Sequence, residues 1–287
     1  MTRQVTQKED FVLYLFVIVD ELIKILNRNR LIGEKKAGRK PVFSESEMIV
    51  IITLRWKSGC LSWKSFYYEV FHWYYPYFQK RIAYQNFIEA IHKTMPLYLQ
   101  IMPLLNFLAL GQSKEMFYLD SCPIEVCHIK RASRNKVCKG VASRKKSSMG
   151  WFFGFKLHAV CNHLRQIVAI EVTTASVDDR GPVPSLMRNL KGIVWADAGY
   201  IGEGLRETLA QMGVRLMAAP RKNMNKMMTF IQHMLLKKRQ KIEQVFSVVK
   251  TRFGLDCSLA RSVKGVFSML LSAVAWYQMK TLFFTEK

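Results

Sequence analysis

From residue 115 onward the chain alternates short apolar runs with helical patterns, and this order limits the possible folds more than any other feature. The runs "MFYLD" at 116–120 and "GIVWAD" at 192–197 are typical of buried strands that end at an acidic residue. Between them, residues 151–162 and 166–176 are rich in β-branched and aromatic residues and are separated by a short polar turn. This pattern predicts an antiparallel hairpin.

Helical patterns separate the later strands. Asp179 with Pro182 predicts a helix start, with the helix running to Leu190, and a second helix at 201–212 should stop at Gly213. The run "VRLMAAP" predicts one more strand, and residues 229–252 have the apolar spacing of one long helix. The order is therefore strand, hairpin, helix, strand, helix, strand, helix. It predicts an α/β fold, a ribonuclease H-like mixed sheet with flanking helices, in which the first and fourth strands are neighbours.

Residues 1–110 have a different texture and predict an all-helical N-terminal domain, followed by the α/β domain at 115–287. Ser44 and Glu47 have capping-box spacing, so a helix should start there and be broken by "SGCLSW". Two helical stretches, 84–95 and 97–110, are expected to be interrupted by prolines. The aromatic run from Phe66 to Phe78 fits a packed core better than a surface that stacks on bases.

The charge of the chain points to polyanions. Its 287 residues include 44 Lys and Arg against 21 Asp and Glu, a formal net charge of +23, which favours binding to phosphates. Half of the residues are hydrophobic, so a core can form and wholesale disorder is excluded. The longest early apolar run, Phe11 to Val19, is far shorter than the ~20 residues that cross a bilayer. The six cysteines form no C-x-x-C pair, and we expect a cytoplasmic protein without a membrane.

Three acidic residues fall where the predicted fold would bring them together. Asp120 and Asp197 end apolar runs on neighbouring strands, and Glu243 lies in the long helical pattern. Each has an ordinary alternative, a turn aspartate or a solvated helix residue. Together they are what a two-metal phosphoryl-transfer site needs, because Mg²⁺ is a hard cation that prefers oxygen ligands. Asp179 is interpreted instead as a helix N-cap.

Basic residues surround these acids. Lys156 and His158 share one face of their predicted strand and would face DNA or solvent. The segment from 130 to 146 has no acidic residue and is either a DNA contact or a surface loop. Its eight basic residues are Lys130, Arg131, Arg134, Lys136, Lys139, Arg144, Lys145 and Lys146.

Four segments carry a resemblance to a known family: "YLDS", "GWFFGFKLH", "WADAGYIG" and "RQKIEQVFSVVK". They resemble the DDE transposases of bacterial insertion sequences, near the group named after insertion sequence nine-eight-two. The last segment has the family spacing of Arg239, Glu243 and Lys250. Two positions differ from the usual family residues, since Leu236 replaces a tyrosine and Ala198 a lysine, and neither would be a metal ligand.

The resemblance implies a function and a site. Asp120, Asp197 and Glu243 would hold two Mg²⁺ ions, or Mn²⁺ in their place, and would catalyse DNA strand cleavage at element ends and strand transfer into target DNA. The implied DNA contacts beyond those already named are Arg239, Lys250, Arg221 and Lys222. The implied partner is double-stranded DNA, bound as a homodimer, with the helical domain recognising the ends. A catalytically impaired relic and a stand-alone ribonuclease H-like nuclease are alternatives, as is a purely structural Arg239–Glu243 ion pair.

Overall fold

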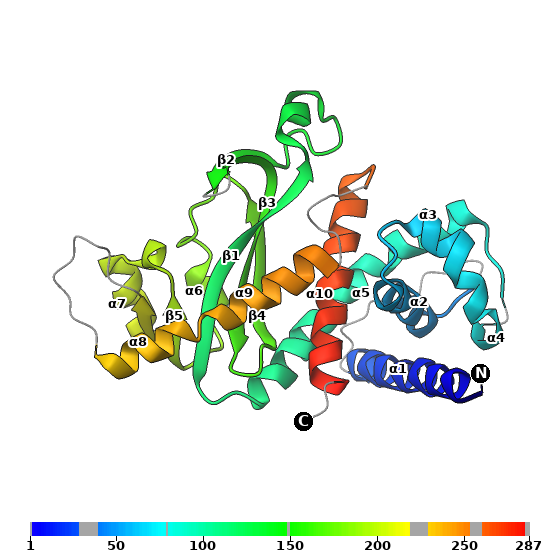
Figure 1. Cartoon of the computed structure of the whole chain (residues 1–287), viewed down its shortest axis with the longest axis horizontal. Helices are drawn as coiled ribbons and strands as arrows, with labels where there is room; N and C mark the ends of the chain where they lie inside the picture. The colour runs from blue at the N-terminus through cyan, green and yellow to red at the C-terminus, as the bar shows by residue number, and fades with distance from the viewer. Residues whose placement is uncertain are drawn as a thin grey trace. The chain divides into compact units, whose positions relative to one another are not determined.

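The computed structural model describes residues 2–28, 40–78, 80–147, 150–218, 229–252 and 260–284. Two compact units make up the chain (Figure 1): unit 1 is Met1–Leu104 with Leu259–Tyr277, and unit 2 is Leu105–Ser258 with Gln278–Lys287. This grouping differs from the expected domains in two respects: residues 105–110 belong to the α/β unit, and most of the last helix belongs to unit 1.

Unit 1 is helical in its described residues. Its helices and helical turns are α1 (Thr2–Arg28), α2 (Glu45–Ser58), α3 (Trp63–Ser65), a π turn η1 (Phe66–Val70), a 3₁₀ turn η2 (Phe71–Tyr74), α4 (Tyr75–Phe78), most of α5 (Tyr84–Gly111) and most of α10 (Val263–Phe283). The predicted start of α2 is confirmed, since Ser44 and Glu47 form a reciprocal capping box. Gly59, with φ of 77°, ends this helix as predicted.

The aromatic run forms part of a packed core. Phe66 and Phe71 are fully buried, and the Phe71 ring stacks on Phe87 with 5.6 Å between centroids. Trp73, by contrast, is 71% exposed, because the π and 3₁₀ turns rotate successive side chains away from regular helical spacing. Phe78 is also buried, so the core interpretation is confirmed for the three phenylalanines but not for the whole run.

The expected pair of helices at 84–95 and 97–110 is wrong, because α5 runs unbroken through Pro96 and Pro103. Buried side chains along its length, including Phe87, Ile91 and Leu105, hold it in place despite the missing hydrogen bonds. Within the described residues, α5 is also the one helix long and apolar enough to cross a membrane by length and composition. The helix is only partly buried, and Leu99, Phe107 and Leu108 are exposed.

Unit 2 is built on a mixed sheet. Its strands are β1 (Met116–Cys127), β2 (Ser143–Ser147), β3 (Gly150–Asn162), β4 (Ile167–Thr174), β5 (Gly192–Ala196) and β6 (Val214–Ala218). They lie in the order β2-β3-β1-β5-β6. The sixth strand, β4, also pairs with β3: β2 pairs with residues 150–154 of β3, and β4 pairs with residues 155–161. The β3–β4 hairpin is antiparallel as predicted, and β1 and β5 are parallel neighbours as predicted for the first and fourth expected strands.

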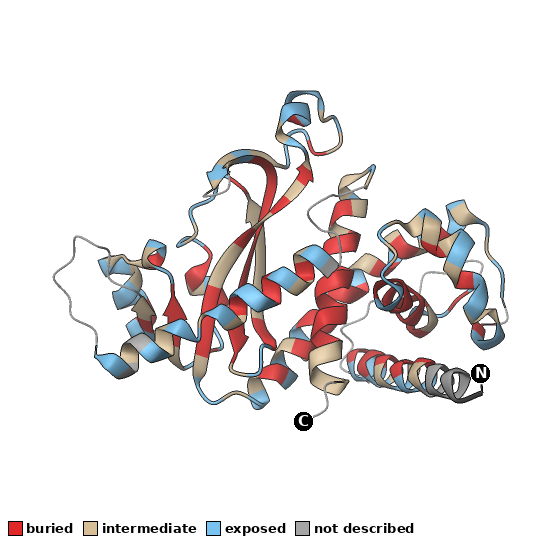
Figure 2. Ribbon diagram, viewed as in Figure 1, coloured by how far each residue is buried: buried red, intermediate tan, exposed pale blue. Residues whose placement is uncertain are grey.

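Helices cover both faces of this sheet. The odd-numbered residues Phe117 and Leu119 of β1 face a core that includes residues of α6 (Val183–Leu186) and α7 (Glu203–Gln211). The even-numbered side chains face the other way, where α9 (Gln240–Ser247) crosses β1 and β3 (Figure 1). The central strand β3 is buried over nearly its whole length (Figure 2).

Two helix predictions are wrong in extent. The helix expected from Asp179 to Leu190 is only the four-residue α6, preceded by Pro182 at its N-cap. The long helix expected at 229–252 is three pieces: α8 (Phe230–Lys237), α9 and a π turn η5 (Val248–Arg252). At the break between α8 and α9, the N–H groups of Lys238 and Arg239 donate to carbonyls three residues back instead of four, which tightens the turn.

Candidate active site

Asp120 of β1 lies level with Asp197, the residue that directly follows the parallel neighbouring strand β5. The last registered pair of β1 and β5 is Tyr118 with Trp195, and each acid lies two residues beyond it. β5 ends at Ala196, so Asp197 opens the following turn and its Oδ1 accepts from the Ala198 N–H at 2.7 Å. The expectation that Asp120 also ends its strand is wrong, because β1 continues to Cys127 through antiparallel pairing with β3.

Arg239 joins the third acid to the first. Its side chain leaves the break between α8 and α9, and its Nη1 lies 2.7 Å from Oδ2 of Asp120. Its Nη2 lies 2.7 Å from Oε1 of Glu243, so the ion pair considered from the sequence is present. A guanidinium has donors on two edges, and here they bridge carboxylates that are 123 positions apart along the chain (243 − 120).

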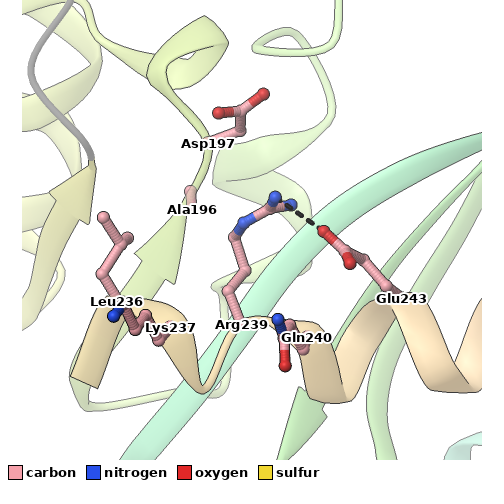
Figure 3. Close-up of a pocket in the computed structure, with 7 residues that line it drawn as sticks. All are labelled: Ala196, Asp197, Leu236, Lys237, Arg239, Gln240 and Glu243. Atoms are coloured by element: carbon pink, nitrogen blue, oxygen red, sulfur yellow. Dashed lines mark hydrogen bonds and ion pairs between the residues drawn. The ribbon is translucent and has the colours of Figure 1, made fainter. Parts of the chain in front are cut away.

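Asp197 and Glu243 line one cleft, and Arg239, which also lines it, reaches Asp120. A cleft of about 250 Å³ lies between the end of β5 and the break in the helix (Figure 3). In Figure 3 the Arg239 side chain extends from the break to Glu243, with Asp197 across the cleft. The lining residues are Ala196, Asp197, Leu236, Lys237, Arg239, Gln240 and Glu243.

The charges of the three carboxylates act on one another. The pKa of Asp120 is raised to about 6, chiefly by burial, and the nearby charges of Asp197 and Glu243 act in the same direction. The Ser121 N–H and the Arg239 guanidinium act in the opposite direction. Burial and then the charge of Asp120 also raise the pKa of the Tyr200 hydroxyl. Such a cluster of negative charge is stabilised by a cation.

The donor set fits a divalent cation in kind. Carboxylate oxygens are the ligands that Mg²⁺ prefers, and one of these carboxylates is largely desolvated. Across the described part of the chain, however, no three Asp, Glu, His or Cys side chains lie close enough to hold one ion. Arg239 stands in as the cation between Asp120 and Glu243, so a metal ion held by both acids requires the guanidinium to give up at least one of its bonds.

A network of hydrogen bonds fixes the other carboxylate oxygen of Asp120. The Ser121 N–H donates to Oδ1 of Asp120 at 2.8 Å, and the Ser121 hydroxyl donates to Oδ1 of Asp179 at 2.9 Å. The same Asp179 oxygen accepts from Nζ of Lys156 at 2.7 Å. Asp179 is therefore not the helix cap that was predicted. Its role could not be read from the sequence, because Ser121 and Asp179 are 58 positions apart.

Lys156 and His158 are part of this network and do not face solvent or a DNA surface, contrary to expectation. They are 5% and 0% exposed, and their contacts are with Thr173 of β4 and with Val177 and Asp179 in the segment that follows it. His158 Nε2 lies 2.9 Å from the Thr173 hydroxyl, and burial lowers the pKa of His158 to about 4. The imidazole is therefore neutral near pH 7, and its 4.0 Å approach to Asp179 is not an ion pair.

The other residues that were predicted to contact DNA belong to several different segments of the chain. Arg221 and Lys222 lie outside the described residues. Lys250 lies in the π turn η5, which rotates it relative to the face that a regular helix would share with Glu243. The basic segment is a 3₁₀ turn η3 (Ile129–Arg134) and strand β2 rather than only a loop. Its exposed basic side chains are Lys130, Arg131, Arg134, Lys136, Lys139, Arg144 and Lys146, while Lys145 is half-buried.

The part of the chain that contains the sheet and the three acids matches a known protein family. A family model described as "Transposase DDE domain" matches residues 110–263, more than half of the 287-residue chain. The chain belongs to the DDE transposase family. The match spans the three acidic residues, the sheet and the helix break. This transposase is thus an enzyme that acts on DNA, as expected from the resemblance and from its charge.

Among solved structures, the transposase is similar to a cryo-EM structure of a piggyBac transposase synaptic complex with hairpin DNA. The TM-score is 0.46 and the sequence identity is 10%. The alignment covers 93% of this chain and 74% of that chain.

Proposed function

We propose that this transposase cleaves DNA strands at the ends of a bacterial insertion sequence and joins them to target DNA in a Mg²⁺-dependent reaction. The observation that carries the proposal is the Arg239 guanidinium bound to both Asp120 and Glu243 at 2.7 Å, at a cleft that Asp197 also lines. Asp120, Asp197 and Glu243 would hold two Mg²⁺ ions, or Mn²⁺ in their place. When bound, the metal supplies activation of the attacking oxygen and stabilisation of the leaving oxygen.

The sheet supports a ribonuclease H-like assignment. A central β1 has antiparallel β3 and then β4 on one side, and parallel β5 and then β6 on the other. This order places the first two acids level on neighbouring strands and leaves the third to a helix that crosses them. We propose that the α/β unit, rather than the helical unit, catalyses the reaction because its sheet brings these acids together.

The protein's own residues would position the DNA. Arg239 is placed to exchange a carboxylate for a phosphate oxygen of the strand to be cut, since guanidinium binds both kinds of oxygen with two donors. Lys250, further along the same helical segment, would hold a second phosphate. Ser121, held by Asp179, fixes one oxygen of Asp120, so the other remains directed at Arg239 and the cleft.

Three further parts of the proposal come from the resemblance and the composition. The helical unit would recognise the element ends, the protein would act as a homodimer on double-stranded DNA, and it would work in the bacterial cytoplasm at the nucleoid. The charge of +23 supports the DNA partner, because neutralising phosphates releases counterions.

The test is incubation of the full-length protein with its own flanking DNA ends and Mg²⁺ or Mn²⁺. We expect strand cleavage at the ends, and a fall in cleavage by a factor of ~10³ or more in Asp120→Asn, Asp197→Asn and Glu243→Gln. Binding of the same DNA in EDTA should change little. Glu207→Gln, an exposed acid on α7 outside the cleft, is the matched control and should cleave normally. Cleavage that survives in any of the three cleft variants would refute the assignment of that acid.

A further inference from the structure

A second, larger pocket lies next to the cleft within unit 2. Its volume is about 710 Å³, and it shares Lys237 and Gln240 with the cleft. The described residues that line it include four basic side chains, Arg165, Lys237, Lys238 and Lys241, and no Asp or Glu. The two hollows therefore differ in charge: the smaller contains carboxylates, and the larger contains cations and amides.

The fold brings these cations together from different elements. Arg165 comes from the tight turn between β3 and β4, where its φ is 65°, and the three lysines come from the end of α8, the break and α9. Lys241 Nζ donates to the His163 carbonyl across the pocket, and Arg165 Nη1 donates to Gln244 Oε1 at 3.3 Å. Neutral oxygens rather than carboxylates are thus the acceptors of these two hydrogen bonds.

The cations of the pocket come from two segments, the turn between β3 and β4 and the region of the helix break, and these segments line the same hollow. Cations packed this closely without a carboxylate among the lining residues are what an anion would stabilise. A volume of several hundred Å³ also has room for more than a single small ion.

We propose that this pocket binds the phosphate backbone of the DNA strand that passes through the cleft, and so holds the strand beside the site of cleavage. The path follows from the shared lining: Lys237 and Gln240 lie on both hollows, and around the break Arg239 lines the cleft while Lys238 and Lys241 line the pocket. A strand lying across the helix break would meet both. This inference rests on the proposed function, because it names a second contact for the same substrate.

The experiment is a salt titration of DNA binding in EDTA, where no cleavage can occur. The Kd of the full-length protein for a fluorescent random-sequence duplex is measured over a series of KCl concentrations. Lys238→Gln with Lys241→Gln should flatten the plot of log Kd against log salt by about one unit for each phosphate that the variant no longer neutralises. Lys238→Gln alone should give a smaller change. Because its side chain is exposed, this single variant also guards against a folding defect from the partly buried Lys241.

The matched control removes two charges elsewhere in unit 2. Lys191→Gln with Arg206→Gln, both exposed and outside the two hollows, should leave more of the salt slope in place than the pocket variant does. An unchanged slope in the pocket variant, or an equal decrease in the control, overturns the proposal. Its failure is separable from that of the proposed function: cleavage by the wild-type protein tests the acids, and the slope in EDTA tests the pocket.

Discussion

At the scale of single residues, Arg239 decides how the site is assembled. The sequence places it four positions before Glu243 on one helix face, which suggests a local ion pair. The structure adds the bond to Asp120, which makes the guanidinium a bridge between a strand and a helix. A side chain in that position both holds the acids together without metal and competes with any cation that they would bind.

Replacement of Arg239 should therefore separate metal binding from cleavage. We expect Arg239→Gln to bind Mn²⁺ more tightly than the wild type in the absence of DNA, by a few-fold to about tenfold. The gain is limited because the half-exposed pair with Glu243 contributes only ~0–1 kcal/mol. Cleavage should nevertheless fall, since glutamine cannot replace the guanidinium that would bind the phosphate. Calorimetric titration with Mn²⁺ measures the first effect and end cleavage the second.

Lys237→Gln is the control for that experiment, because Lys237 lines the same cleft and leaves the bridge intact. Its Mn²⁺ affinity should stay closer to the wild-type value than that of Arg239→Gln. Weaker Mn²⁺ binding by Arg239→Gln would show instead that the guanidinium braces Glu243 for the metal, and would contradict the competition described above.

The residues of the site were only partly predictable. Asp120 and Asp197 could be found because each follows an apolar run, and Glu243 because of its spacing from Arg239 and Lys250. The hydrogen bonds that link Ser121, Asp179 and Lys156 next to Asp120 could not be predicted, because these residues come together only when the chain has folded. Lys156 looked like a surface residue because strand alternation gives the face of a side chain but not what covers that face.

At the scale of elements, the break between α8 and α9 matters most for the site. The apolar spacing from 229 to 252 continues across it, and the segment contains no Gly or Pro, so the pattern predicted one helix. Residues on both sides of the break line the cleft and the basic pocket, and Lys237 and Gln240 are common to the two. Strands were easier to predict, since β5 and β6 are short, largely apolar runs: β5 begins at Gly192 and ends before Asp197, and β6 follows Gly213.

The pairing of β1 with β3 depends on a glycine. A Cβ added to Gly154 would lie 2.0 Å from the Ile124 carbonyl oxygen, a backbone atom that cannot move aside without disturbing the strand. We expect Gly154→Ala to lower the free energy of unfolding by about 2–3 kcal/mol or more, because the added methyl group overpacks the sheet. Urea unfolding followed by circular dichroism measures the change.

Gly204→Ala is the matched substitution in the same unit. Gly204 lies in helix α7, and nothing lies within 4 Å of its added Cβ. Alanine there should stabilise the protein by about 0.5–1 kcal/mol, since glycine loses more conformational freedom in a helix. If the two variants unfolded at the same urea concentration, the close approach of β3 to β1 would not be the constraint that the geometry indicates.

At the scale of the whole molecule, the charge is distributed unevenly relative to the acids. Asp197 and Glu243 line one small cleft and Arg239 joins Asp120 to it, while exposed basic residues extend over the segment from Ile129 to Ser147 and the second pocket. Composition alone predicted a polyanion partner, and the family confirms DNA. Composition could not say which basic residues act, because long-range attraction depends on summed charge and close contacts depend on the fold.

The last prediction tests whether the basic segment and the basic pocket act on the same DNA. Alternate residues of β2 are exposed, so Arg144 and Lys146 present their charges on one side of the strand, and Lys130 and Arg131 add two more from η3. Replacing these four by Gln should reduce the salt slope of duplex binding by up to about four units, one for each phosphate that is no longer neutralised. Equilibrium binding in EDTA at several KCl concentrations measures the slope.

Combination with the pocket variant makes that test sharper. The segment and the pocket share no lining residue, so their phosphate contacts should be independent and their decreases in slope should add. An unchanged slope in the four-residue variant would mean that the segment does not contact the duplex. A combined decrease no larger than the greater single decrease would mean that the two surfaces do not bind the duplex at the same time, because independent sites on one DNA release their counterions separately.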